Sequence, residues 1–101
     1  MSVKNGMRPV HPGEILCEEL ETLGLSANEL AKALDVSLDC ISEVLSGQRD
    51  VTADIALRLA RYFGTTPQVW LNLQKTYELR QAEIEVGQRI AERVKPRRAM
   101  A

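Results

Sequence analysis

The sequence predicts an all-α protein with five helices, and three observations support that fold class. Residues that cap helix starts (Ser, Thr) and residues that end helices (Gly) alternate along the chain. Between them, apolar residues recur three and four positions apart, which is the period of a helix with one buried face. Alternating apolar and polar runs, the pattern of strands, are almost absent. The 101 residues, 45% hydrophobic and 27% charged, fit one ordinary globular domain.

The first helix is expected at residues 13–23. Pro12 suits a first helical turn, because its missing N–H would have no partner there anyway. Glu14 favours the positive end of the helix dipole, and Gly24 ends the helix. The predicted apolar stripe consists of Ile15, Leu16, Leu20 and Leu23.

Two short helices follow, joined by a tight turn. Ser26 and Glu29 have the spacing of a capping box, which marks a helix start. Residues 35–36 form the predicted turn, Ser37 caps the third helix, and residues 46–47 end it. The inward-facing residues predicted for the two helices are Leu30, Ala31, Leu34, Ile41, Val44 and Leu45.

The fourth and fifth helices have equally clear limits. Thr52 caps the fourth helix and Gly64 ends it, while Thr66 caps the fifth and Pro67 enters its first turn. The fifth helix is expected to end before Pro96. The predicted apolar faces are Ile55, Ala56, Leu59, Ala60 and Phe63 for the fourth helix, and Val69, Trp70, Leu73 and Tyr77 for the fifth.

These elements define three segments. Residues 1–10 lack a pattern and are predicted to be a flexible N-terminal arm, residues 11–94 form the helical domain, and residues 95–101 form a basic tail. Lys4 and Arg8 make the arm basic. Both basic ends either contact a DNA backbone or are simply solvated. The basic residues near the C-terminus are Arg89, Arg93, Lys95, Arg97 and Arg98.

The second and third helices are too short to hold their shape alone, so they must pack on the others. Two short helices with a tight turn, spanning roughly Ser26 to Gly47, are typical of a helix-turn-helix that lies against DNA. In such a motif the later of the two helices, here the third helix of the chain, enters the major groove with its N-terminal part. The N-terminus of the earlier one, the second helix of the chain, offers free N–H groups to a phosphate.

Several motifs resemble one family. The residues from Ser26 to Ala31 (SANELA), followed by Ile41–Ser42 and Ser46–Gly47, resemble the helix-turn-helix of the lambda-repressor-like (XRE) family. The segments HPGEIL, VTADIALRLARYFGTTP and WLNLQ, which begin at His11, Val51 and Trp70, resemble HigA/VapI antitoxins. The similarity covers about residues 8–95.

That resemblance implies a five-helix lambda-repressor-like DNA-binding domain with an extended C-terminal helix. It also implies a homodimeric antitoxin that binds a palindromic operator in double-stranded DNA, represses its own operon and neutralises a HigB-like toxin, a RelE-like ribonuclease. Such a protein is a cytoplasmic bacterial regulator without cofactor or metal, and it is not an enzyme. A stand-alone XRE-type transcriptional regulator fits the helix-turn-helix equally well.

The resemblance assigns DNA contacts to particular positions. Asp39 has the chemistry to accept a hydrogen bond from a cytosine amino group, and Leu38 to touch a thymine methyl. Gln48 and Arg49 are expected at phosphates, because helix capping does not explain them. Capping alone accounts equally well for three of the other candidates. The full predicted set is Ser26, Ser37, Leu38, Asp39, Ser42, Gln48, Arg49 and Thr52.

The charge distribution favours an alternative. Residues 1–50 contain four basic and nine acidic side chains, and residues 51–101 contain nine basic and five acidic ones. Asp39 and Glu43 point outward where phosphates would repel them. The third helix is therefore a reader of bases, or it is mostly scaffold in a toxin-binding module with weak DNA binding. The acidic half suits a basic toxin on charge grounds.

Four apolar residues of the fifth helix have two interpretations. Trp70, Leu71, Leu73 and Tyr77 belong to the core, or part of this set faces a second subunit as a dimerisation surface. The second interpretation arises because the fifth helix exceeds what a single small core needs.

Enzymatic and metal sites find no support. His11 lacks a nucleophile or carboxylate at a recognisable spacing, so a structural role at a helix start is favoured over catalysis. Cys17 and Cys40 with a single histidine cannot supply the four ligands of a structural zinc site. Two free thiols in a reducing compartment are the simplest account. No apolar run approaches the length of a membrane span or a signal peptide.

Overall fold

The predicted helices are present in the computed structural model, which describes residues 8–97. They are α1 (Pro12–Leu23), α2 (Ala27–Leu34), α3 (Leu38–Leu45), α4 (Ala53–Phe63) and α5 (Pro67–Arg93). Within those residues no strand occurs, and the predicted all-α fold with an extended C-terminal helix is confirmed. Lys4 of the predicted arm and Arg98 of the predicted tail lie outside the described residues.

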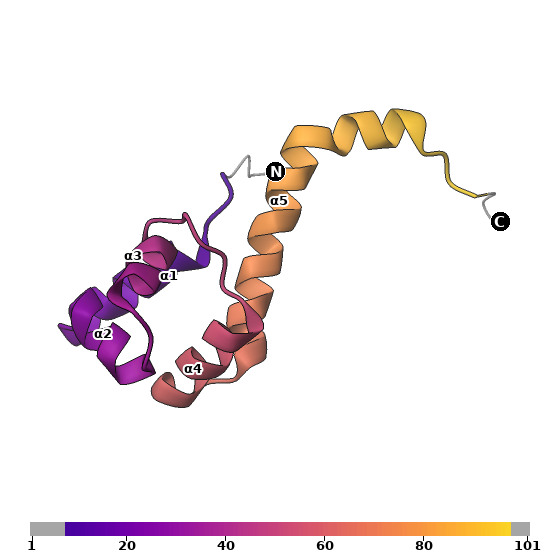
Figure 1. Cartoon of the computed structure of the whole chain (residues 1–101). Helices are drawn as coiled ribbons and strands as arrows, with labels where there is room; N and C mark the ends of the chain where they lie inside the picture. The colour runs from indigo at the N-terminus through magenta and orange to yellow at the C-terminus, as the bar shows by residue number, and fades with distance from the viewer. Residues whose placement is uncertain (1–7, 98–101) are drawn as a thin grey trace.

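The core lies where α1 to α4 meet the first half of α5 (Figure 1). Leu16, Leu30, Ile41 and Leu59, one from each of the first four helices, are almost wholly buried. Trp70 of α5 completes this cluster with 5% of its surface exposed. Burying a large apolar side chain stabilises the fold by roughly 1.5–3 kcal/mol, so this cluster is what holds the short α2 and α3 in place.

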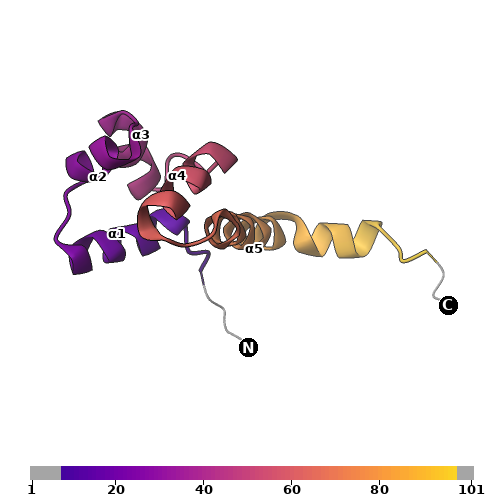
Figure 2. The same cartoon turned by 90° about the horizontal axis from the view of Figure 1, so that it is seen from below.

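The helix α5 extends far beyond this core. A helix of 27 residues is about 40 Å long, and the molecule measures 52 × 23 × 21 Å. Figures 1 and 2 show the C-terminal part of α5 bending and running clear of the other helices. Both isoleucines of this part are exposed, Ile84 at 65% and Ile90 at 51%. No helix within residues 8–97 has the length and apolar character needed to cross a membrane.

Most predicted helix ends are confirmed by their hydrogen bonds. Ser37 Oγ accepts the Cys40 N–H at 3.1 Å, and Thr52 Oγ1 accepts the Ile55 N–H at 3.3 Å. The prediction for Thr66 was wrong in its mechanism. Thr66 occupies the cap position of α5, but its side chain makes no capping hydrogen bond, and only its backbone carbonyl accepts the Val69 N–H.

Two residues of the predicted apolar faces are exposed. Leu23 is 51% exposed at the end of α1, and Val69 is 46% exposed in the first turn of α5. Both have the correct helical spacing, but no neighbouring element covers their side of the helix. Leu45 and Phe63 are half-buried and pack against the core from its edge.

The start of α1 packs tightly against the end of α3. His11 caps α1, because its Nδ1 accepts the Gly13 N–H at 2.9 Å, and its side chain is buried. Its ring meets Tyr77 of α5 edge to face, with centroids 4.9 Å apart. Gly13 lies directly against the backbone of Val44 in α3. The predicted structural role of His11 is therefore what the fold displays.

Candidate nucleic-acid interface

The helix-turn-helix consists of α2, α3 and the turn between them. At the start of α2, Ser26 Oγ accepts the Glu29 N–H at 3.0 Å and Glu29 Oε1 accepts the Ser26 N–H at 2.8 Å. The capping box predicted from the sequence is thus complete. It also engages the Ser26 N–H, so a phosphate at this end would meet the next backbone N–H groups of α2 instead.

The turn between α2 and α3 depends on Arg58 of α4, a contact that sequence patterns did not identify. Asp35 adopts a left-handed conformation, with φ of 60°. Arg58 of α4 donates from Nη1 to the carbonyl oxygens of Leu34 and Asp35, at 2.8 and 3.1 Å. Its Nε donates to Asp54 Oδ1 at 2.6 Å. Arg58 therefore ties the turn to α4, and only its i,i+4 spacing from Asp54 was visible in the sequence.

The outward face of α3 carries the predicted base-reading residues. Leu38 is 44% exposed, and Asp39 and Ser42 are exposed beside it. Nothing in the described part of the chain hydrogen-bonds to the Asp39 carboxylate. An exposed leucine and an unengaged carboxylate at the start of a short helix are not needed by the core, so they are available to a ligand.

The loop after α3 folds back onto that helix. Gly47 has a φ of 82°, a conformation that favours glycine. The N–H groups of Gln48 and Arg49 both donate to the Glu43 carbonyl, at 2.8 and 3.1 Å. The Arg49 side chain donates from Nε to Glu43 Oε1 at 2.8 Å, and this ion pair raises the pKa of the Arg49 guanidinium. The loop thus presents side chains to solvent, while the backbone N–H groups of Gln48 and Arg49 are already used.

A buried glutamine anchors the end of the same loop. Gln74 of α5 is 2% exposed, and its Oε1 accepts the Val51 N–H at 2.8 Å. Its Nε2 donates to Glu78 at 2.9 Å, which lowers the pKa of that carboxyl group. Because the two partners lie 23 residues apart in sequence, no local pattern predicted the contact. Gln74 fixes the point at which the chain leaves the candidate DNA face, which is formed by Leu38, Asp39, Ser42, Gln48 and Arg49.

The four residues proposed for dimerisation have different environments. Trp70 is in the core and donates from Nε1 to Thr65 Oγ1 at 3.1 Å. Its side chain is therefore buried within a single protomer and does not need a second subunit to cover it. Leu71 and Leu73 are half-buried against the core, and Tyr77 packs on His11. Trp70 therefore follows the core interpretation, whereas Leu73 and Tyr77 retain exposed surface.

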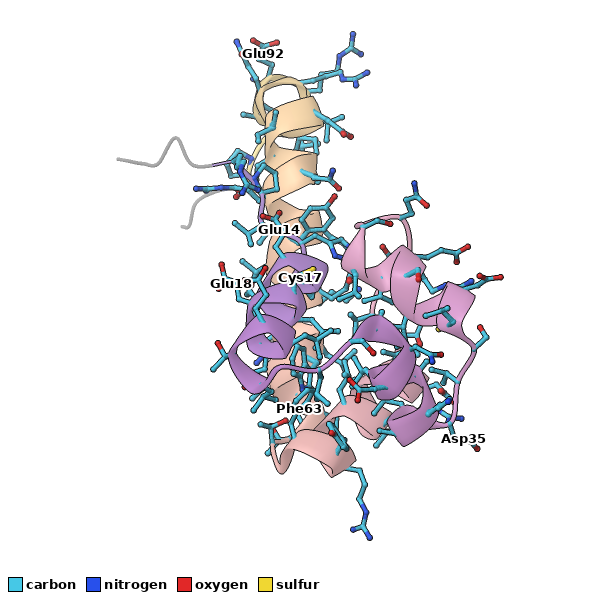
Figure 3. All side chains as sticks on the ribbon, turned by 90° about the vertical axis from the view of Figure 1, so that its left-hand side faces the viewer. Glu14, Cys17, Glu18, Asp35, Phe63 and Glu92 are labelled. Atoms are coloured by element: carbon cyan, nitrogen blue, oxygen red, sulfur yellow. The ribbon has the colours of Figure 1, made fainter. Side chains whose placement is uncertain are left out.

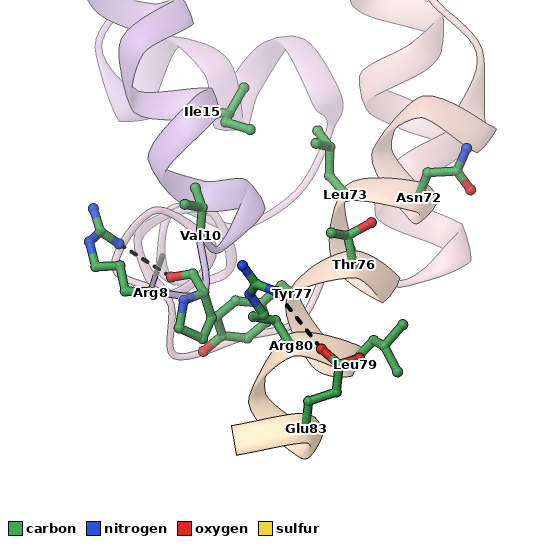
Figure 4. A pocket seen from close by; sticks show the side chains of 11 residues that line it. Arg8, Val10, Ile15, Asn72, Leu73, Thr76, Tyr77, Leu79, Arg80 and Glu83 are labelled. Atoms are coloured by element: carbon green, nitrogen blue, oxygen red, sulfur yellow. Dashed lines mark hydrogen bonds and ion pairs between the residues drawn. The ribbon is translucent and has the colours of Figure 1, made fainter. Parts of the chain in front are cut away.

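Leu73 and Tyr77 line a groove of about 600 Å³ between α5, the start of α1 and residues 8–10. Figure 4 shows apolar side chains along it and an Arg80–Glu83 ion pair, 3.9 Å apart, at one end. Arg8 closes the other end and pairs with Glu14 at 2.7 Å, an interaction that lowers the pKa of the Glu14 carboxyl group. Leu79 stands on this face with 62% of its surface exposed.

The remaining candidate groups are a pair of thiols and an acidic helix face. Cys17 and Cys40 are free thiols, as predicted. Both are half-buried, and burial raises the pKa of the Cys17 thiol. Figure 3 shows Glu18 on the side of α1 that faces away from α2 and α3, and Glu19 and Glu21 are exposed on the same helix. Among the described residues, no group of His, Cys, Asp or Glu side chains is arranged to hold a metal ion.

Comparison with known proteins identifies this arrangement. Residues 18–70 match the model of a family described as "Helix-turn-helix". Virulence-associated protein I of Dichelobacter nodosus is 58% identical over 81 residues, which are 79% of this chain and 75% of that protein. The chain belongs to the helix-turn-helix family. This is a family of DNA-binding proteins, not of enzymes.

Solved structures place the helix-turn-helix protein among HigA-type relatives. An addiction module antidote protein of the HigA family from Coxiella burnetii is 51% identical, with a TM-score of 0.89, covering 90% of this chain and all of that one. The Pseudomonas aeruginosa antitoxin HigA, solved with the higBA promoter, is 43% identical with a TM-score of 0.85, covering 88% and 98% of the two chains. The predicted resemblance to HigA/VapI antitoxins is confirmed.

Proposed function

We propose that the protein is a homodimeric antitoxin that binds a palindromic operator, represses its own operon and neutralises a HigB-like, RelE-like ribonuclease toxin. The observation that carries the proposal is the exposed outer face of α3, which the hydrogen bonds of Arg58 to the α2–α3 turn hold in place. It occurs in a chain 43% identical to an antitoxin solved with promoter DNA. In a symmetric dimer the two α3 helices would enter the major groove about 34 Å apart.

The DNA contacts proposed for this chain are those at which the structure leaves exposed side chains. Leu38, Asp39 and Ser42 would meet base edges, and Gln48 and Arg49 would meet phosphates beside them. Ser26, Ser37 and Thr52 hold the three helix starts, whose free N–H groups would support phosphates. Asp39 adds specificity at a cost in affinity, because it repels the backbone.

Fluorescence anisotropy with the DNA upstream of the gene tests this surface. Ser42→Glu adds a charge and bulk at the centre of the outer face of α3, and we expect at least a 100-fold loss of operator affinity, since one blocked half-site contact acts in both protomers. Gln68→Glu adds the same charge in the first turn of α5 and should leave affinity unchanged. Equal effects of the two substitutions would remove α3 from the interface.

The homodimer is proposed to form through the groove beside α5. Its apolar lining is exposed in one protomer, and its Arg80–Glu83 pair can exchange partners with the same pair of a second copy across a two-fold axis. We expect Leu79→Glu to yield a monomer in analytical ultracentrifugation. Leu57→Glu is the control, because Leu57 is similarly exposed (60%) but lies on α4 outside the groove. A Leu79→Glu dimer would exclude this face.

A toxin-binding module with weak DNA binding is favoured by one observation. Arg49, in the loop after α3, and Arg58, which binds the α2–α3 turn, are both paired with carboxylates, while Glu18 and its neighbours leave α1 acidic. A co-purification with the product of the neighbouring gene tests this function. A complex that forms while operator binding stays at the level of random DNA would favour the module over the repressor.

A further inference from the structure

The strongest unexplained feature of the candidate DNA face is the ion pair between Arg49 and Glu43. One carboxylate oxygen, Glu43 Oε1, accepts hydrogen bonds from both Nε and Nη2 of Arg49. Both side chains are open to solvent, with 48% and 41% of their surface exposed. The core does not require the pair, so its presence on the loop beside α3 calls for a functional account.

The backbone holds the two partners together. Because the N–H groups of Gln48 and Arg49 bond to the Glu43 carbonyl, the loop returns to the last turn of α3 and brings the guanidinium onto the carboxylate of the same residue. Ser46 Oγ donates to that carbonyl as well, at 3.1 Å. The pair is therefore built into the loop geometry.

Arg49 differs from the other paired arginine near the turn. Arg58 also binds a carboxylate, but its Nη1 is fixed on two backbone carbonyls of the α2–α3 turn. Arg49 has no such second anchor in the described structure, and its only side-chain partner is Glu43. Between residues 14 and 49 the sequence contains only one other basic residue, Lys32. Of the two paired arginines, Arg49 is thus the one that can be transferred to a ligand.

A carboxylate and a phosphate offer a guanidinium the same planar pair of acceptor oxygens. An exposed ion pair of this kind is weak enough to exchange partners. When Arg49 moves to a phosphate, its ion pair with Glu43 is lost, and that loss is the cost of the transfer. We propose that Glu43 competes with DNA phosphate for Arg49 and so holds down the phosphate-driven part of DNA binding. This inference rests on the proposed DNA-binding function.

Glu43→Gln tests the competition. The amide has the same shape but no charge, so Arg49 should transfer to a phosphate at lower cost. We expect DNA affinity to rise about three- to five-fold per protomer, and therefore about ten-fold or more for a dimer. The slope of log affinity against log salt should steepen by up to about 0.9 per protomer, the value for one further phosphate neutralised. The measurement is anisotropy with operator and with random-sequence duplex across a salt series.

Asp54→Asn is the matched control. It removes the same charge from a carboxylate that also pairs with an arginine, but Arg58 stays bound to the carbonyls of Leu34 and Asp35. We expect less than a two-fold change in affinity. A second control repeats Glu43→Gln in the Arg49→Ala background, where the gain should disappear, because the arginine through which Glu43 acts is missing. Thermal melts establish that each variant is folded.

The outcomes separate this inference from the proposed function. Equal gains from Glu43→Gln and Asp54→Asn, or a gain that persists without Arg49, would show simple charge repulsion and overturn the competition. A wild-type protein that prefers its operator no more than random duplex would overturn the proposed operator function. The competition is still decided on random duplex in that case, because it acts on phosphates, and a wild-type protein that binds neither duplex overturns both.

Discussion

Two surfaces of α3 meet very different environments. Its inner end, at Val44, is buried against the first turn of α1, where His11 and Gly13 leave almost no free space. Its outer face, formed by Leu38, Asp39 and Ser42, is exposed and carries an unengaged carboxylate. The inner contact fixes where α3 lies, and the outer face is left free for a ligand. A change at the first should destroy the fold, and a change at the second should alter binding alone.

The largest effect is expected from Gly13→Ala. A Cβ at position 13 would overlap the carbonyl oxygen of Val44, a backbone atom that also accepts the Gly47 N–H. Because backbone cannot yield as a flexible side chain does, α1 must separate from α3. We expect a loss of about 3–5 kcal/mol in unfolding free energy, in the range of severe core defects. Urea denaturation followed by circular dichroism measures it.

Gly87→Ala provides the control for that substitution. Gly87 is also helical, but only the Glu83 Cβ, at 3.8 Å, lies near a Cβ built there. Since alanine has the higher helix propensity, this variant should be as stable as the wild type or slightly more so. If Gly13→Ala were equally stable, the close approach of α1 to α3 would not determine the fold.

A smaller loss is expected from His11→Ala. The substitution removes the cap hydrogen bond to the Gly13 N–H and the edge-to-face contact with Tyr77, and it leaves a cavity in a buried position. Together these should cost about 2–4 kcal/mol. His11→Asn keeps a capping oxygen and should recover about 1 kcal/mol of that loss. Identical unfolding free energies for the two variants would exclude capping as part of the role of His11.

Contacts between residues close in sequence were predicted, whereas contacts between distant residues were not. Helix starts at Ser26, Ser37 and Thr52 were predicted correctly because each depends on hydrogen bonds to residues three positions away. The contacts of Arg58 with Leu34 and of Gln74 with Val51 were missed, because the partners are 24 and 23 residues apart. Helical periodicity predicts which residues share a face of a helix, but it does not predict which other element packs against that face.

The same limitation applies to the candidate DNA face. The sequence identified Arg49 as a phosphate ligand and Glu43 as an outward acid, but it did not indicate that they pair with each other. Their contact depends on how the glycine at position 47 turns the chain back onto α3. The long α5 was predicted, but whether Leu73 or Trp70 remained accessible depended on which elements packed against each side.

On the outer face, Asp39→Asn should change base preference while leaving the fold intact. A carboxylate accepts from a cytosine amino group, whereas an asparagine pairs with adenine through both its donor and its acceptor. We expect preference at one position of each half-site to move from C·G to A·T, by about 1–3 kcal/mol. Anisotropy with operators mutated singly at each position measures this. A uniform change across all operators would mean that Asp39 acts through charge only.

The smallest effect is expected at the turn that joins the two helices. Asp35 holds a left-handed conformation that costs an L-residue roughly 1–2 kcal/mol, less for aspartate than for most. Its carboxylate also stands at the negative end of the α2 dipole. Asp35→Gly relieves both and keeps the backbone carbonyl that Arg58 binds, so we expect a net gain of about 0.5 kcal/mol after the entropy cost of glycine.

Asp35→Ala reverses the sign and makes the test decisive. Alanine loses the charge as glycine does, but it keeps the Cβ that disfavours a positive φ, and a loss of about 0.5–1 kcal/mol should follow. Opposite changes in unfolding free energy for the two variants would show that backbone conformation, rather than charge, limits the stability of this turn. Because the turn sets the angle between α2 and α3, operator affinity should follow stability only in the alanine variant, where strain at position 35 would be relieved by a shift of α3.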